Sequence, residues 1–271
     1  MLPITEGYIS WRDQRIAFET SGEGKPILFL HNGGADREVW RRQIEFFARS
    51  YSVLAFDFVG YGKSSRPDFP YTLQDQVSQL VAVLENRKIE NPVLVGNCVG
   101  SATAIEFARL YPDRVDKLVL ANVCGGPSFF PPLKLIARWP KVIALVTWFT
   151  SKVVYSPKLL WGDPPENSDP LYTYFKESII KDPGFYLNRK NMTIGSLTFV
   201  KFGDRLPMPP GFPRNILFWG EKNKIMPRRY AETCLQYLKS EKFHSLPGAG
   251  HFCMHERAEL VNREIEEFLG N

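Results

Sequence analysis

The sequence lacks the features that mark several large classes of protein. No apolar run reaches the roughly 18 to 20 residues that span a bilayer, and the longest candidate, 142–154, is interrupted by polar residues. Lys and Arg form no dense run, no DNA- or RNA-binding motif occurs, and the net charge of +5 is mild. These absences argue against a membrane-spanning protein and against a nucleic-acid-binding protein.

Cysteine and histidine are scarce, with four of each. Cys98, Cys124, Cys234 and Cys253 lie far apart and lack the spacing of metal ligands. The start of the chain shows no basic segment followed by an apolar stretch, so we expect no secretion signal, reduced thiols and a cytoplasmic protein. Neither a phosphate-binding loop nor a dinucleotide fingerprint is present, and we therefore expect no cofactor and no metal.

The chain does contain a regular alternation of short apolar strands and helices. The apolar content of 44% and charged content of 23% are typical of a globular protein. The alternation predicts an α/β fold with a mostly parallel central sheet flanked by helices. The predicted strands are 7–12, 15–19, 26–30, 52–58, 92–95, 117–122, 215–219 and 242–246, and the predicted helices are 40–47, 73–86, 99–110, 228–238 and 258–269.

The alternation stops in the middle of the chain. Residues 125–208 are rich in proline, aromatic and basic residues, with helical patterns at 133–137 and 140–154. We interpret this block as an inserted helical lid, and residues 1–124 and 209–271 as the two halves of one core.

A cysteine stands between two glycines where a predicted strand gives way to a predicted helix. The segment is Gly96-Asn97-Cys98-Val99-Gly100. This is the G-x-nucleophile-x-G turn, with Cys where Ser is more usual. The turn exposes the thiol at the carboxyl end of the sheet and at the amino terminus of a helix, which favours the thiolate. We therefore predict that Cys98 is a nucleophile.

This turn and five other segments resemble the α/β-hydrolase family over nearly the whole chain. The other segments are His31-Asn32-Gly33-Gly34, Asp57 to Ser64, Pro112-Asp113-Arg114-Val115, Trp219-Gly220-Glu221-Lys222-Asn223 and Gly248-Ala249-Gly250-His251. The resemblance implies an α/β-hydrolase fold with an inserted helical lid. It places the general base at His251, and it makes His31 a brace for its loop; His244 is then expected to be structural and His255 to be a surface residue.

The resemblance also implies an oxyanion hole and a third catalytic residue. The backbone N–H groups of Gly33 and Val99 are the expected oxyanion donors, although Asn32 departs from the usual His-Gly opening. At the family's two positions for the acid this chain carries Asn223 and Asn122. We predict a Cys98–His251–Asn223 triad with Asn122 as the alternative orienting residue; Asp204 and Glu221 are the remaining candidate acids.

A cysteine nucleophile points to acyl transfer through a covalent thioester on Cys98. The expected enzyme is a thioesterase, esterase or lactonase, or an acyltransferase or cyclase, acting on a small hydrophobic acyl substrate. Residues 127–205 carry 11 Lys and Arg against 6 Asp and Glu, which suggests an acidic carrier protein or a coenzyme A thioester as partner. The alternative is a non-hydrolytic member of the family: a cofactor-free lyase or oxygenase with His251 as base, or a binding protein.

Overall fold

A computed structural model gives the fold of the chain. It describes residues 2–124, 139, 142, 156–163, 166, 168–182, 191, 195 and 208–270. An eight-stranded sheet forms the centre of the protein, in the order β1-β2-β4-β3-β5-β6-β7-β8. The strands are β1 (Thr5–Trp11), β2 (Gln14–Ser21), β3 (Pro26–Leu30), β4 (Ser52–Phe56), β5 (Val93–Asn97), β6 (Lys117–Ala121), β7 (Arg214–Gly220) and β8 (Lys242–Leu246).

The sheet is parallel over most of its width. Strand β1 pairs antiparallel with β2, and β2 pairs antiparallel with β4. From β4 across to β8 every pairing is parallel. The carboxyl ends of β3, β5, β6, β7 and β8 therefore lie along one edge of the sheet, which is where open α/β sheets bind their ligands.

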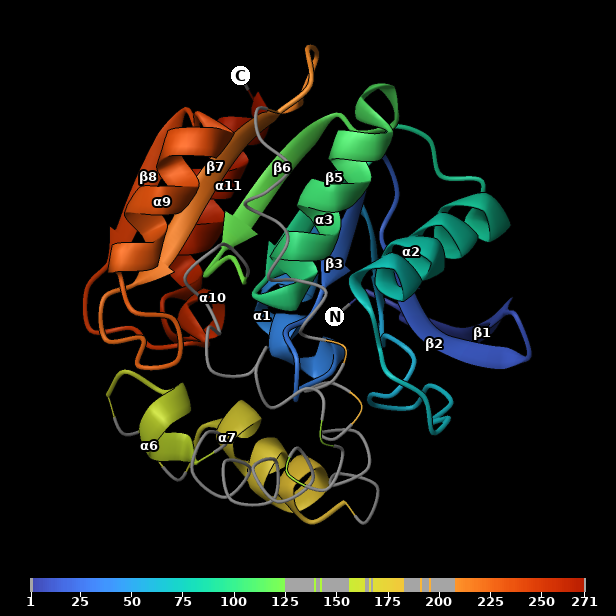
Figure 1. The fold of residues 1–271 in the computed structure, drawn as a ribbon, viewed down its shortest axis with the longest axis horizontal. Helices are drawn as coiled ribbons and strands as arrows, with labels where there is room; N and C mark the ends of the chain where they lie inside the picture. Colours follow the sequence, from blue (N-terminus) through green and yellow to red (C-terminus); the bar gives the residue numbers. More distant parts are fainter. Residues whose placement is uncertain are drawn as a thin grey trace.

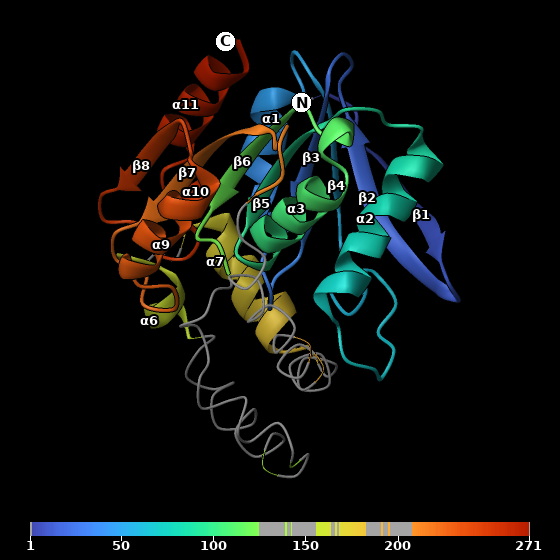
Figure 2. The same ribbon diagram turned by 45° about the horizontal axis from the view of Figure 1, so that its top comes forward.

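Helices cover both faces of the sheet, as Figures 1 and 2 show. They are α1 (Arg41–Phe47), α2 (Leu73–Arg87), α3 (Val99–Leu110), α9 (Arg229–Leu238), α10 (Cys253–Glu256) and α11 (Ala258–Gly270). Along each parallel strand successive side chains point to opposite faces, and each face packs against its own helices. Leu94 contributes to the core beneath α2, α3 and α9. Its neighbours Val93 and Val95 contribute to the core beneath α1 and α11. The two layers hold the strand ends rigidly in place.

The turn from β5 into α3 depends on two glycines that have no room for a side chain. A Cβ atom on Gly96 would lie 2.5 Å from the backbone nitrogen of Ser101. A Cβ atom on Gly100 would lie 2.1 Å from the carbonyl oxygen of Leu30 at the end of β3. Between them Cys98 has φ 55° and ψ −112°, a conformation that costs roughly 1–3 kcal/mol. The close packing of α3 against β3 stabilises this strained residue.

Parts of the central block lie at the carboxyl edge of the sheet. Short helices α6 (Pro157–Leu160) and α7 (Pro170–Tyr174) are followed by the π-helical turn η3 (Phe175–Ile180). Figure 1 shows α6 and α7 beyond the ends of the strands. Apart from Val142, the helices predicted at 133–137 and 140–154 lie outside the described residues, so the lid as a whole stays a prediction. None of the helices in the described ranges has the length and apolar character needed to cross a membrane.

We predict that Gly100→Ala destabilises the protein, whereas Gly270→Ala does not. The added methyl on residue 100 meets backbone that cannot move freely, and such overpacking lowers the free energy of unfolding by about 1–3 kcal/mol. Gly270 also lies in a helix, but a methyl group added there would have no other atom within 4 Å. Denaturant unfolding of both variants checks this, and equal stability of the two would contradict the close packing at the turn.

Candidate active site

Cys98 lies at the carboxyl edge of the sheet, between β5 and the amino terminus of α3. Cys98 is 8% exposed. A hydrogen bond from the Cys124 thiol is the largest cause that holds the pKa of Cys98 well below its usual range. A hydrogen bond from the His251 side chain and one from the backbone N–H of Val99 lower this pKa further, and burial opposes them. The sulfur is therefore surrounded by donors that stabilise a thiolate.

Cys124 is a neighbour of Cys98 that the sequence alone did not single out. It follows β6 by three residues, and its backbone N–H donates to the carbonyl oxygen of Cys98 at 3.3 Å. Its residue is 3% exposed, and its hydrogen bond to Cys98, together with burial, raises the pKa of Cys124 well above the usual range. Cys124 thus stays protonated as a donor. The only signal in the sequence was its place just after a buried strand at the carboxyl edge.

The backbone of His251 is held from both sides. Its N–H donates to the carbonyl oxygen of Leu160 at 2.6 Å, which ties it to α6. Its carbonyl oxygen accepts from Nδ2 of Asn97 at 3.0 Å and from Nδ2 of Asn122 at 3.1 Å. The residue is buried. These bonds fix His251 beside the turn that carries Cys98.

Glu256 joins the histidine loop to the central block. Its two carboxylate oxygens accept from the N–H groups of Gly250 and Gly162, both at 2.8 Å. Burial raises the pKa of Glu256 to about 7, against the lowering effect of these two bonds. Next to this clip the rings of Trp161 and Phe252 lie 4.6 Å apart. The described part of the central block is therefore packed directly against the histidine loop.

Asn223 contacts the ring of His251. Its Nδ2 lies 3.2 Å from Nδ1 of the histidine. Its Oδ1 accepts from the backbone N–H groups of Ile225 at 3.1 Å and Met226 at 2.9 Å. The loop after β7 thus brings Asn223 to the ring, and its role as third member of the triad stays a prediction.

The other candidates for orienting the histidine lie elsewhere. Asn122 contacts the backbone of His251 and not its ring, and its Oδ1 accepts from the N–H of Gly220 at 3.2 Å. Glu221 is exposed and accepts a hydrogen bond from the Ser245 hydroxyl at 2.8 Å. Asp204 lies outside the described residues.

The loop of the predicted oxyanion hole lies beside the turn, because Gly100 packs on the end of β3. The ring of His31 braces it: Nε2 accepts from the N–H of Phe58 at 2.9 Å, and Nδ1 donates to the carbonyl oxygen of Asn32 at 2.8 Å. Gly33 follows in a turn, and Val99 is the first residue of α3. An N–H in the first turn of a helix has no partner within the helix. That of Val99 donates to the Cys98 sulfur, and its role as an oxyanion donor stays a prediction.

The two remaining histidines lie outside this cluster. His244 lies in β8, as expected. The expectation that His255 is a surface residue is wrong: it is 4% exposed, and its Nε2 lies 2.9 Å from Oδ2 of Asp169. A residue of the central block covers it, which local sequence patterns do not reveal.

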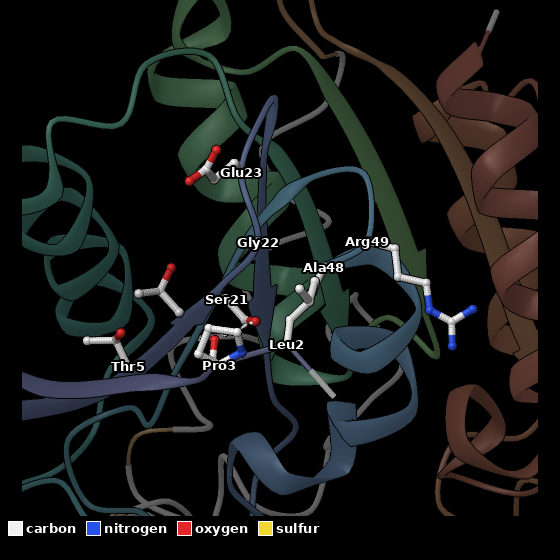
Figure 3. Close-up of a pocket in the computed structure, with 9 residues that line it drawn as sticks. Leu2, Pro3, Thr5, Ser21, Gly22, Glu23, Ala48 and Arg49 are labelled. Atoms are coloured by element: carbon white, nitrogen blue, oxygen red, sulfur yellow. Dashed lines mark hydrogen bonds between the residues drawn. The ribbon is translucent and has the colours of Figure 1, made fainter.

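A pocket at the opposite edge of the sheet offers no comparable chemistry. Figure 3 shows it between the amino-terminal residues Leu2 and Pro3, the Ser21–Glu23 loop and Ala48. These loops precede β3 and β4, so the pocket faces the amino ends of the parallel strands. No His or Cys is among the described residues that line it. The candidate site is therefore the cluster around Cys98.

A parallel sheet with a tight Gly-x-Cys-x-Gly turn after its central strand and a histidine after its last strand is typical of the α/β-hydrolase class. The family model described as the alpha/beta hydrolase fold matches residues 25–258. The chain belongs to the α/β-hydrolase fold family.

Several known proteins are similar to this chain. A 2-hydroxy-6-oxo-6-(2'-aminophenyl)hexa-2,4-dienoic acid hydrolase of Metapseudomonas resinovorans is 26% identical over 260 residues, 92% of this chain and 85% of the relative. A cis-3-alkyl-4-alkyloxetan-2-one decarboxylase of Shewanella oneidensis is 22% identical over 298 residues, 99% of this chain and 89% of the relative. The structure of a thermophilic esterase from Thermogutta terrifontis matches with a TM-score of 0.81 and 23% identity, over 98% of each chain. The structural likeness shows the shared fold.

We predict that acid destabilises the protein through His31. Burial is the main cause that lowers the pKa of His31 to about 4, whereas an unfolded histidine titrates near about 6.5. Between these values the unfolded chain binds a proton that the folded chain does not. The stability contributed by neutral His31 is therefore complete above pH ~6.5 and falls by up to about 3 kcal/mol as the pH approaches 4. Denaturant unfolding across this interval should show a steeper pH slope for the wild type than for His31→Gln; equal slopes would contradict the assignment.

We predict that Cys124→Ala makes Cys98 less acidic. A hydrogen bond to a charged group contributes about 1.5–3 kcal/mol, so its loss should raise the midpoint of the pH profile of Cys98 alkylation by roughly 1–2 pH units. The matched control is Cys234→Ala, which removes another buried thiol, on α9. Iodoacetamide rates can be assigned by peptide mass, because trypsin places the four cysteines in separate peptides, 89–109, 118–134, 230–239 and 243–257. If the midpoint of the Cys98 alkylation profile is unchanged in Cys124→Ala, Cys124 is not the donor that lowers the pKa of Cys98.

Proposed function

We propose that the protein is an acyl-transfer enzyme that works through a covalent thioester on Cys98, with His251 and Asn223 completing the catalytic triad. The observation that carries the proposal is the surroundings of the Cys98 sulfur. It lies in a strained strand–helix turn, among three hydrogen-bond donors that lower its pKa: Cys124, His251 and the backbone N–H of Val99. The relatives named as hydrolases support hydrolase-type chemistry on a small-molecule substrate.

The proposed reaction has two steps. The Cys98 thiolate attacks the acyl carbon, and the N–H groups of Gly33 and Val99 stabilise the negative charge on the carbonyl oxygen. The bond to the leaving group then breaks, and the acyl group stays on Cys98. In the second step water or another nucleophile attacks the thioester, the bond between the acyl carbon and sulfur breaks, and Cys98 leaves as a thiolate. A proton carried by the attacking nucleophile passes to His251 or to solvent. If water is the acceptor, the protein is a thioesterase, esterase or lactonase. If another nucleophile is the acceptor, the protein is an acyltransferase or cyclase.

The partner hypothesis rests on charge and is a separate proposal. The basic excess falls in residues 127–205, most of which lie outside the described residues. An acidic carrier protein or a coenzyme A thioester would be attracted by this excess of positive charge, and added salt would slow the association. Acylation rates with carrier-bound and free donors should then differ in their salt dependence, and salt-insensitive rates for both would remove the hypothesis.

We predict that activated esters and acyl thioesters leave an acyl group on the wild-type protein and not on Cys98→Ala. Intact-protein mass after brief exposure measures the adduct, and the tryptic peptide 89–109 should carry it. Cys253→Ala is the matched control, because Cys253 is another buried thiol near the site. A mass gain that survives in Cys98→Ala would show that Cys98 is not the nucleophile. Loss of the adduct in buffer alone would indicate a hydrolase, and faster loss on adding amines or thiols would indicate a transferase.

One relative favours a second candidate, a lyase. The Shewanella oneidensis relative is named as a decarboxylase of an oxetan-2-one, which is a cyclic ester. A lyase or oxygenase would use His251 as a base without acylating Cys98. Activity that survives Cys98→Ala and disappears in His251→Ala would support this candidate over acyl transfer.

A further inference from the structure

The amide of Asn223 can face His251 in only one orientation. One end of the amide lies within 3.1 Å and 2.9 Å of two backbone N–H groups, those of Ile225 and Met226. Two donors require an acceptor, so this end is the oxygen Oδ1. The NH₂ group is therefore the end that lies 3.2 Å from Nδ1 of His251. Turning the amide over would set its NH₂ group against both backbone donors.

An asparagine held in this way donates to the histidine, whereas an aspartate would accept from it. Nδ1 must supply the lone pair for this hydrogen bond, so a neutral His251 carries its proton on Nε2. The His251 side chain also forms a hydrogen bond with the Cys98 sulfur. Because Asn223 occupies Nδ1, we infer that the donor to the thiolate is Nε2–H. A proton on Nδ1 would point at an amide N–H. A histidine that accepts a proton at Nε2 must be the neutral tautomer protonated on Nδ1, and a histidine that donates one from Nε2 is the imidazolium, protonated on both nitrogens. Both forms carry a proton on Nδ1, so the Asn223 amide opposes both.

We propose that Asn223 holds His251 as the tautomer protonated on Nε2, and that the site therefore selects acyl donors whose leaving group departs as a stable anion, thioesters above all. This inference rests on the proposed acyl-transfer function and names its donor class. Attack by Cys98 on a thioester gives an intermediate that carries two sulfur atoms, that of Cys98 and that of the donor. Either can leave as a thiolate. Neither thiolate needs a proton.

An alkyl ester behaves differently at the same site. Its leaving group is an alkoxide, roughly seven pKa units more basic than a thiolate, taking bulk water near 15.7 as the guide. Without a proton from the histidine, the intermediate expels the Cys98 thiolate and re-forms the ester, and the alcohol is not released. Water is disadvantaged in the second step for the same reason, since it must lose a proton as it attacks. The acyl group on Cys98 should therefore pass to a thiolate faster than to water.

The tautomer can be measured without any substrate. Nitrogen-15 NMR of labelled protein distinguishes protonated from unprotonated ring nitrogens, and His251→Gln assigns the signals. His31 is an internal reference of the opposite kind, because its Nδ1 donates to Asn32 and its Nε2 accepts from Phe58. We expect His251 to carry its proton on Nε2 in the wild type and on Nδ1 in Asn223→Asp. A wild-type proton on Nδ1 would overturn the proposal.

Donor selectivity is measured with a thioester and an alkyl ester of the same acyl group. The wild type should acylate Cys98 at least about a hundredfold faster from the thioester. Asn223→Asp should raise the alkyl ester rate by about 10²- to 10⁴-fold, since an Asp-to-Asn change in such a triad costs about 10⁴, and should change the thioester rate far less. Asn86→Asp, an exposed position on α2, makes the same chemical change as a control and should alter neither rate.

The possible failures can be told apart. Equal rates from the two donors in the wild type, with no gain in Asn223→Asp, would overturn the donor preference even if Cys98 is acylated. No adduct from any donor would instead remove the acyl-transfer function and the donor class with it, while the nitrogen-15 signals would still decide the tautomer.

Discussion

The site depends on one buried amide, that of Asn122, which joins the ends of neighbouring strands. Its Nδ2 donates to Oδ1 of Asn97 at 3.0 Å and to the carbonyl oxygen of His251 at 3.1 Å, while its Oδ1 accepts from Gly220 at 3.2 Å. The ends of β5, β6 and β7 are thereby tied to the histidine loop. An apolar residue at this position would leave several buried polar groups without partners, each at a cost of about 1–3 kcal/mol. Asn122, at one of the two positions where the family carries its catalytic acid, thus connects the strand ends to the histidine loop.

Much of the core could be predicted because its strands and helices are short, apolar and separated by clear turns. The segments 26–30, 99–110 and 242–246 match β3, α3 and β8 at both ends. The strand predicted over 52–58 ends earlier, at Phe56, although Phe58 is fully buried. An apolar run does not distinguish a strand from a buried loop. The bend begins where Asp57 is needed as a hydrogen-bond partner of Arg37.

The site was only partly accessible from sequence, because its members come from distant segments. Cys98, His251 and Asn223 follow recognisable strand ends, and the fold brings them together. Cys124 gave almost no local signal, and its importance comes from the parallel pairing of β5 with β6. The burial of His255 by Asp169, 86 residues away, had no signal at all. Contacts across the sheet edge and with the central block depend on tertiary packing, which periodicity does not encode.

Cysteine at position 98 and asparagine at position 223 suit one another electrostatically. A serine must lose its proton during the attack and needs a histidine that can take it, which an aspartate beside the ring promotes. A thiolate exists beforehand, and its difficulty is the burial of a negative charge. An aspartate at position 223 would place a second negative charge near that thiolate and raise its energy. The neutral Asn223 amide avoids this repulsion and leaves the donors from Cys124, Val99 and His251 to stabilise a single charge. In the proposed mechanism the site forgoes proton transfer through the histidine and uses a nucleophile that does not need it.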